Sequence, residues 1–405
     1  MWIVLFVVLL DIVGFGIIIP IFPFHAANLG AGPGMITLCL ALYSGAVFIA
    51  TPVLGRLSDR YGRKPIMAIS LLGAVIGYVI LAYAETIFMV AFSRVFSGVM
   101  AGNFSAAQAY VTDSTSDQDR AKYMGLLGAV MGLGFVIGPA IGSWLGGDSF
   151  TDANFVAPAL VAAGLSLAAF FALIFFVKES LPKHVRQQVS TQKRPGLLQS
   201  IAAIRHRYLL VVLISCGSLY QLASGFYESI FPLWAEAFAI IEGPNGMLPM
   251  LLASGMSYVI TSAVLIGPLT KRFSERHLMM VAALTMAATC YGITIAGNYG
   301  SALWVTLLMM LLSMSAGIIM ICAQALVSRC AAEHERGMVL GVYSAAGMLA
   351  RTITTALSGV MFGQLHYHSP YFAAAITAMV LCWMAFILVR FQPATGALLE
   401  DLPAN

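Results

Sequence analysis

The chain alternates between long apolar runs and short polar breaks. Each run is about 20 residues long, which is the length that an α-helix needs to cross roughly 30 Å of hydrocarbon at about 1.5 Å per residue. Because backbone polar groups in a bilayer must find hydrogen-bond partners within the protein, we interpret these runs as helices. The pattern predicts twelve membrane-spanning helices, which begin near Trp2, Met35, Ile66, Ile87, Lys122, Val156, Tyr208, Leu248, Leu278, Ala302, Met338 and Tyr371.

The positions of Lys and Arg predict the orientation of these spans. If Met1 is cytoplasmic, the cytoplasmic loops contain nearly all of the 21 basic residues and the outer loops contain none. Only Arg94 and Arg351 fall inside predicted spans. The first run lacks a basic leader and a small-residue cleavage site, so we expect it to be retained as a helix. We therefore expect a multi-pass cell-membrane protein with both termini in the cytoplasm.

Composition supports a membrane protein and excludes several functions. The chain is 60% hydrophobic and 9% charged, whereas a soluble globule carries about 25% charged residues. A nucleic-acid partner would need a soluble basic domain, which the pattern lacks. The six cysteines show no CxxC spacing, and His366 and His368 have no acidic or cysteine neighbour, so we expect no metal and no cofactor. Motifs such as HExxH and GxSxG are absent, and we do not expect an enzyme.

The chain divides into two related halves. Residues 106–125 align without gaps to residues 322–341, which places Gln108 opposite Gln324 and Arg120 opposite Arg336. Two parallel six-helix repeats are typical of a transporter that rocks around a site at mid-membrane. We predict a first half at residues 1–177, a cytoplasmic linker at 178–207, a second half at 208–392 and a cytoplasmic tail at 393–405.

Four ionisable residues lie well inside predicted spans, where a charge costs about 2.5–3.5 kcal/mol on insertion scales. Asp11 and Arg94 have similar depths when residues are counted from the ends of their helices, so they are predicted to pair. Desolvation favours a neutral carboxyl group and a guanidinium favours a charged one, so such a carboxyl group can exchange a proton. We therefore expect Asp11 to couple transport to protons under the influence of Arg94. The alternative is a pair that only locks two helices together.

Glu228 and Arg351 form a second predicted polar centre, which faces the substrate. Small and polar residues recur around them at helical spacing, a pattern typical of either a cavity wall or close helix packing. Aromatic residues near Glu228 could accept a planar or cationic lipophile, although core or lipid-facing packing is equally consistent with them. The predicted substrate cavity comprises Gln108, Gln221, Glu228, Phe231, Gln324 and Arg351.

Four motifs carry a family resemblance. The loop GRLSDRYGRK, Gly55 to Lys64, resembles the signature that follows helix 2 in the major facilitator superfamily. Three stretches resemble motifs of helices 1, 4 and 5 in its twelve-helix drug:proton antiporters, with Ser143 standing where the last glycine of the third is expected; they are LDIVGFGIIIPIFP, RVFSGVMAG and GFVIGPAIGS. The motifs lie within residues 1–145, and the nearest group resembles tetracycline-efflux-type exporters. The resemblance implies an all-α integral membrane fold, with 12 transmembrane helices in two pseudo-symmetric halves, and a monomer.

The resemblance also implies roles for individual residues. In relatives the loop's Asp lies against the inner end of helix 11 and a loop Arg pairs with an acid of helix 4, which implies Asp59 near Gly337 to Gly341 and Arg63 with Asp113. The helix 5 motif, Gly134, Gly138, Pro139 and Gly142, is thought to seal the pathway and bend the helix between the halves; a structural kink is the alternative. The implied cytoplasmic gate comprises Gly55, Asp59, Arg60, Gly62, Arg63, Lys64 and Asp113.

These observations together predict a proton-coupled exporter of small amphipathic molecules that works by alternating access in a bacterial inner membrane. Its partners would be a small-molecule substrate, protons and the lipid bilayer. One alternative is a passive facilitator of the same fold. Another is an exporter of a dedicated metabolite, such as a siderophore-like compound or a lipid. The sequence leaves the identity of the substrate open.

Overall fold

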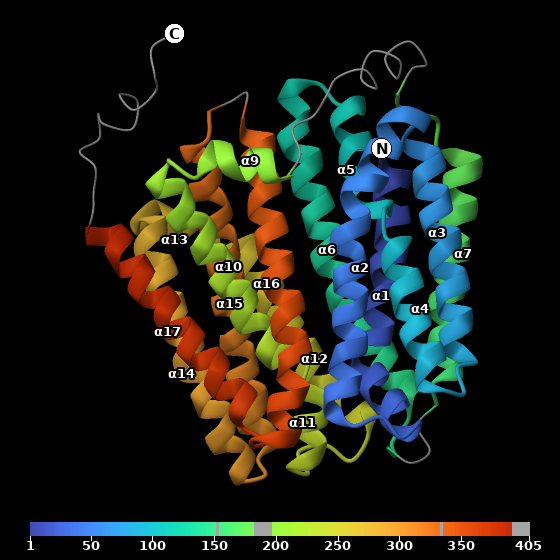
Figure 1. Cartoon of the computed structure of the whole chain (residues 1–405), viewed down its shortest axis with the longest axis vertical. Helices are drawn as coiled ribbons and strands as arrows, with labels where there is room; N and C mark the ends of the chain where they lie inside the picture. Colours follow the sequence, from blue (N-terminus) through green and yellow to red (C-terminus); the bar gives the residue numbers. More distant parts are fainter. Residues whose placement is uncertain (151–153, 182–196, 333–334, 391–405) are drawn as a thin grey trace.

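The structure, a computed structural model, describes residues 1–150, 154–181, 197–332 and 335–390. Within these residues the regular structure is entirely helical, and twelve helical segments are long and apolar enough to cross a membrane. The predicted all-α fold and the predicted number of spans are therefore confirmed. The helices run roughly parallel to one another (Figure 1).

The first half contains spans 1 to 6, and the fourth span is divided into two helices. Thr86 begins that span as an N-cap, because its side chain accepts a hydrogen bond from the Met89 N–H. The helices are α1 (Trp2–Asn28), α2 (Pro33–Tyr61), α3 (Arg63–Ala82), α4 (Ile87–Val99), α5 (Asn103–Ser114), α6 (Asp117–Gly146) and α7 (Val156–Phe176).

The second half contains spans 7 to 12, preceded by the short helix α9 (Leu197–Ile204). Span 7 breaks at Ser229 and Ile230. The next helix begins at Phe231, and the missing N–H of its second residue, Pro232, is tolerated in the first turn. Span 8 contains a 3₁₀ turn η1 (Pro244–Met247) and a π-helical turn η2 (Thr261–Leu265). The remaining helices are α10 (Tyr208–Glu228), α11 (Phe231–Ala237), α12 (Leu248–Ile260), α13 (Ile266–Arg272), α14 (Glu275–Asn298), α15 (Ala302–Cys330), α16 (Arg336–Gln364) and α17 (Ser369–Arg390).

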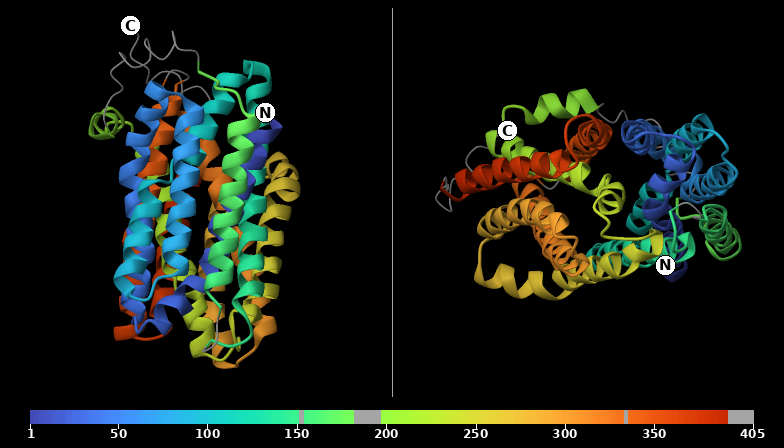
Figure 2. Two further views of the ribbon diagram at one scale, coloured as in Figure 1. Left: turned by 90° about the vertical axis from the view of Figure 1, so that its right-hand side faces the viewer. Right: turned by 90° about the horizontal axis from the view of Figure 1, so that it is seen from below.

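The two halves stand side by side, and Figure 2 shows them from one end as a blue-to-green cluster and a green-to-red cluster. Within the first half α1 packs against α6 and α7, and within the second half α14 packs against α15 and α17. The halves meet where α2 contacts α16 and where α6 contacts α12. Residues 182–196 of the predicted linker and the predicted tail 393–405 lie outside the described residues.

The two ends of the bundle differ in how the halves meet. We call the end that carries Arg56, Arg60, Arg63 and Lys64 the basic end, and the other the opposite end. At the opposite end Thr37 of α2 accepts a hydrogen bond from the Gly359 N–H of α16 at 3.2 Å, and the Asn245 side-chain amide donates to Asp148 at 2.8 Å. At the basic end a methyl group added at Gly55, Gly337 or Gly341 would meet no atom within 4 Å. The halves are thus closely packed at the opposite end and leave room around these glycines at the basic end.

Candidate functional site

Asp11 lies on α1 against the first residue of α5. Its Oδ2 accepts a hydrogen bond from the Asn103 Nδ2 at 2.9 Å. The Asn103 residue is only 3% exposed, and its Oδ1 is buried without a hydrogen-bond partner among the described residues. The carboxyl group predicted to couple protons is therefore held by a neutral amide that has one unused acceptor.

Arg94 does not pair with Asp11, and this corrects the sequence prediction. Its guanidinium lies 5.5 Å from the ring centroid of Phe22 and 6.0 Å from that of Tyr43, and it donates to the Ser93 hydroxyl at 3.3 Å. Phe22 is eleven residues beyond Asp11, about 16 Å further along the helix. The prediction compared the depths of the two backbones, whereas the arginine side chain extends toward the opposite end.

Asn103 is a candidate site residue that the sequence pattern did not predict. The pattern drew attention to ionisable residues inside spans, and an asparagine carries no charge. A useful signal was nevertheless present, because a buried amide in hydrocarbon also costs free energy unless it is hydrogen-bonded. Asn103 directly follows the Met100–Gly102 break, where hydropathy alone predicts one continuous helix.

Glu228 and Arg351 form an ion pair between the end of α10 and the middle of α16. Their side chains are 39% and 38% exposed, so the pair faces open space instead of being sealed in the protein. Next to it, the hydroxyl groups of Ser229 and Ser358 share a hydrogen bond of 2.8 Å, which fastens the same two helices. The charges are thus held by packed helices and remain accessible.

A cavity of about 270 Å³ lies between the halves beside this ion pair. Its lining includes the predicted residues Glu228 and Phe231. Arg351 does not line the cavity but forms an ion pair with Glu228, which does. The predicted residues Gln108, Gln221 and Gln324 are not part of its lining. The first half contributes Ile19, Gly132, Phe135 and Val136, and the second half contributes the polar groups Tyr220, Tyr227, Ser254, Tyr258, Ser313 and Tyr371.

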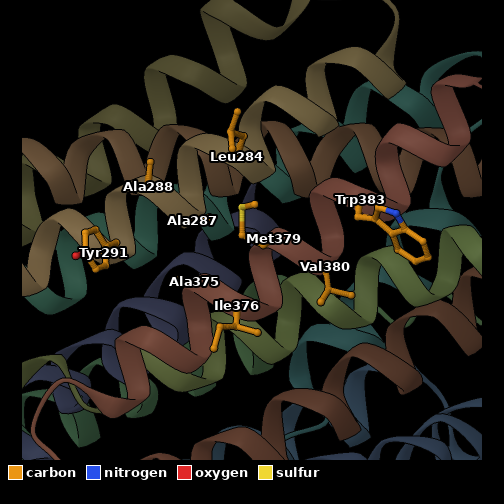
Figure 3. A pocket seen from close by; sticks show the side chains of 9 residues that line it. All are labelled: Leu284, Ala287, Ala288, Tyr291, Ala375, Ile376, Met379, Val380 and Trp383. Atoms are coloured by element: carbon orange, nitrogen blue, oxygen red, sulfur yellow. The ribbon is translucent and has the colours of Figure 1, made fainter.

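A larger hollow of about 590 Å³ lies elsewhere, between α14 and α17 (Figure 3). Its lining includes Leu284, Tyr291, Ile376 and Trp383, and each of these four residues is more than half exposed. It contains no charged residue and opens on the outside of the second half. We therefore interpret it as a lipid-facing groove, and the smaller cavity between the halves as the candidate substrate site. Among the described residues no group of three or more His, Cys, Asp or Glu side chains could hold a metal ion.

The predicted gate residues gather around Arg63 at the basic end. The guanidinium of Arg63 contacts Asp59 at 2.7 Å, Asp113 at 2.8 Å and the Ser58 hydroxyl at 3.2 Å. The Arg63 N–H donates to Glu179 at 2.9 Å. We call Ser58, Asp59, Arg63 and Asp113 the gate network.

The other gate residues surround this network. Gly62 joins α2 to α3 with φ 108°, which favours glycine. Lys64 donates to the Ile174 carbonyl at 2.8 Å, and the guanidinium of Arg60 lies over the Tyr61 ring. A methyl group at Gly337 or Gly341 would meet no described atom within 4 Å, and the implied approach of Asp59 to this end of α16 stays a prediction.

The helix 5 motif packs α6 against α1 within the first half. A methyl group at Gly138 would lie 2.6 Å from the Val13 carbonyl oxygen, and one at Gly134 would lie 2.6 Å from the Ile12 side chain. Pro139 contacts α1 opposite Gly16, and a methyl group at Gly142 would overlap the Ile17 carbonyl. These motif residues thus face α1, while α6 itself lies at the interface between the halves and contacts α12 through other residues such as Val136. The implied role of the motif in sealing the pathway stays a prediction.

Comparisons with known proteins agree with this architecture. The family model of the Major Facilitator Superfamily matches residues 4–351 and 213–402. The chain is 29% identical to the class C tetracycline resistance protein of Escherichia coli over 94% of this chain and 92% of the relative. It is 30% identical to the class G protein of Vibrio anguillarum over 84% of each, and 26% identical to multidrug resistance protein 2 of Bacillus subtilis over 91% and 89%.

Solved structures show the same fold at lower identity. The structure of a D-xylose-proton symporter superposes with a TM-score of 0.77 at 15% identity, covering 96% of this chain and 97% of that one. The human organic anion transporter gives a TM-score of 0.68 at 18% identity, covering 95% and 98%. At these identities the likeness supports the arrangement of helices alone.

Proposed function

Because the chain belongs to the major facilitator superfamily, a family of membrane transporters and not of enzymes, we propose that it is a proton-coupled antiporter that exports small amphipathic molecules. The observation that carries this proposal is the state of Asp11. The carboxyl group lies inside a membrane span, and its hydrogen-bond partner is the neutral Asn103 amide. An arginine partner would favour the charged form, whereas an amide leaves the carboxyl group free to bind and release a proton.

The cavity between the halves supports an amphipathic substrate. Its aromatic and aliphatic lining suits a ring system, and the exposed Glu228–Arg351 pair offers one charge of each sign. Relatives of this chain are named tetracycline resistance and multidrug resistance proteins. A charged substrate group would replace one partner of the ion pair, which compensates for part of the cost of removing the substrate from water.

We place the protein in a bacterial inner membrane as a monomer, with the basic end in the cytoplasm. In this orientation the structure corresponds to a state that is closed toward the outside. Export then requires the opposite end to open while the basic end closes, in the rocking motion of transporters built from two repeats.

The test uses purified protein in lipid vesicles that contain a pH-sensitive dye. A pH gradient is imposed, and uptake of cationic, zwitterionic and anionic compounds is measured together with the proton flux. We expect at least one compound to move against its own gradient while protons move in the opposite direction. Transport that continues unchanged when an uncoupler removes the proton gradient would indicate a passive facilitator instead.

Variants test which residues couple transport to protons and which bind the substrate. Asp11→Asn is expected to abolish uphill transport, because the amide cannot bind a proton, and to leave downhill exchange measurable. Glu85→Gln is the matched control, since Glu85 is an exposed carboxylate at the opposite end. Glu228→Gln is expected to weaken transport of cationic compounds more than that of anionic ones. Uphill transport by Asp11→Asn at the wild-type rate would contradict the assignment.

A further inference from the structure

We propose that α5 is a rigid link that transmits the protonation state of Asp11 to the gate network. The inference rests on the proposed function, because it assumes that Asp11 binds and releases the coupled proton. The first residue of α5, Asn103, contacts Asp11, and its eleventh residue, Asp113, contacts Arg63 at 2.8 Å. One uninterrupted helix thus joins the two sites across about 15 Å.

The Asn103 amide can respond to the proton by reversing its role. With Asp11 charged, the amide Nδ2 donates to the carboxylate, as the structure shows. With Asp11 protonated, the carboxyl group becomes a donor and needs an acceptor. The Asn103 Oδ1 is such an acceptor, and it is buried and unused in the present arrangement. A half-turn of the amide plane therefore satisfies Asp11 in both states and changes the interaction that holds the start of α5.

The charge of Asp11 also affects the start of α5. Asp11 lies beside the amino-terminal end of α5, where the helix dipole attracts a negative group. Protonation of Asp11 removes this attraction and replaces a charge-assisted hydrogen bond with a weaker neutral one. The start of α5 is then held less firmly against α1.

The break before α5 gives the helix freedom to move. Met100 to Gly102 separate α4 from α5, so a displacement of α5 need not bend α4. The Gly102 N–H donates to the Ser70 hydroxyl at 3.2 Å, and a methyl group at Gly102 would lie 2.8 Å from Leu54. The pivot is thus fixed against α2 and α3, while the carboxy-terminal end of α5 carries Asp113 into the gate network.

Few other groups near Asp11 can respond to pH. The elements around it carry Cys39 and Tyr43 on α2, Tyr78 on α3 and Arg94 on α4, and α5 itself carries Tyr110 and Asp113. The histidine of α1, His25, lies fourteen residues from Asp11, about 21 Å further along the helix. From Tyr123 onward α6 has no charged residue, and α7 has none along its length. Because cysteine, tyrosine and arginine side chains ordinarily ionise above neutral pH and His25 is remote, the pH response is assigned to Asp11, with Asp113 as the other carboxyl group on this path.

The test measures the gate directly. Spin labels at Thr112→Cys on α5 and Gly337→Cys on α16 report the distance between the halves at the basic end, in a background where Cys330 and Cys382 are replaced by serine. We expect the distance distribution to change between about pH 5.5 and about pH 8.5, the range over which a buried carboxyl group can titrate. The variant Asp11→Asn is expected to show the low-pH distribution at both values.

Variants at position 103 separate signalling from folding. Asn103→Leu keeps the side-chain size, but leucine can neither donate nor accept a hydrogen bond. We expect the pH-dependent change in the distance between the labels to fall about tenfold or more, which corresponds to the loss of one hydrogen bond to a charged group. Asn103→Ser retains a group that donates and accepts, and should restore part of the response. Thermal melting of each purified variant establishes that it is folded. Gly insertion after Ala109, which interrupts α5 between the two sites, should abolish the response in the same way as Asn103→Leu.

Two results would overturn the inference. One is a full pH response in folded Asn103→Leu, and the other is a wild-type protein whose labels do not respond to pH. If the vesicle assay still shows proton-driven transport in either case, the proposed function stands and the link through α5 fails. If that assay shows no proton coupling, the proposed function itself fails.

Discussion

At the scale of single residues, His368 is held in one protonation state by its neighbours. The Trp234 indole N–H donates to its Nδ1 at 3.1 Å, so the Nε2 that lies 3.1 Å from the Asn298 Oδ1 must carry the proton. The imidazole is therefore neutral and joins α11 to the end of α14. Burial, and then the nearby His366, lower the pKa of His368 below its ordinary value of 6.5.

This arrangement predicts that acid destabilises the opposite end. Between the ordinary pKa and the lower native one, the unfolded chain binds a proton that the native protein does not, so stability falls as the pH is lowered through this window. We expect the melting temperature in detergent to decrease as the pH is lowered from about 7.5 through about 6. His368→Gln should reduce this slope, whereas His277→Gln, at an exposed histidine of the basic end, should not. Equal slopes for wild type and His368→Gln would refute the prediction.

At the scale of helices, hydropathy predicts the spans well and their interruptions poorly. The starts at Trp2, Ile87, Val156, Tyr208 and Ala302 agree with the structure to the residue, because bilayer thickness fixes the length of an apolar run. A broken helix and a continuous one have the same hydropathy. The division of span 4 therefore had to come from packing contacts that no local pattern contains.

The same limit applies to the candidate site. Asp11, Glu228 and Arg351 could be chosen from the sequence because an ionisable group inside a membrane span costs free energy and is rare. In the structure Asp11 lies against a buried amide, and Glu228 lines the cavity between the halves. The partners were harder to predict, since they depend on where a long side chain extends. Arg94 extends away from Asp11, whereas the Glu228–Arg351 contact joins neighbouring helices α10 and α16.

The tight contact of α6 with α1 predicts opposite effects for two glycines of one helix. Gly138→Ala places a methyl group 2.6 Å from the Val13 carbonyl oxygen and should cost about 1–3 kcal/mol, the usual penalty of overpacking. Gly128→Ala meets no atom within 4 Å and should be neutral or stabilising by up to about 1 kcal/mol, because alanine favours helix more than glycine does. Melting temperatures of the two variants measure the difference. A Gly138→Ala protein as stable as Gly128→Ala would show that α1 and α6 are not held at this distance.

At the scale of the whole molecule, the packing of α2 against α16 determines which end is open. Near the opposite end a methyl group added at Gly34 would lie 3.3 Å from the Val360 side chain, and Thr37 contacts Gly359. Near the basic end Gly55 and Gly341, on the same two helices, have open space beside them. The two helices therefore diverge from a contact at one end, and the proposed rocking motion would exchange the open end and the closed end.

This geometry predicts that a covalent bond at the opposite end traps the protein. In the double variant Gly34→Cys and Val360→Cys, with Cys330 and Cys382 replaced by serine, the two thiols should form a disulfide, because the added Cβ at position 34 lies 3.8 Å from the Cα of Val360 and 3.3 Å from its side chain. Oxidation should stop transport in vesicles and a reductant should restore it, while each single variant should transport under both conditions. The labels at positions 112 and 337 should then report one distance at every pH, because the closed opposite end keeps the basic end apart. Transport that persists in the fully oxidised double variant would mean that the halves do not need to separate at α2 and α16, and alternating access by rocking would have to be abandoned for this chain.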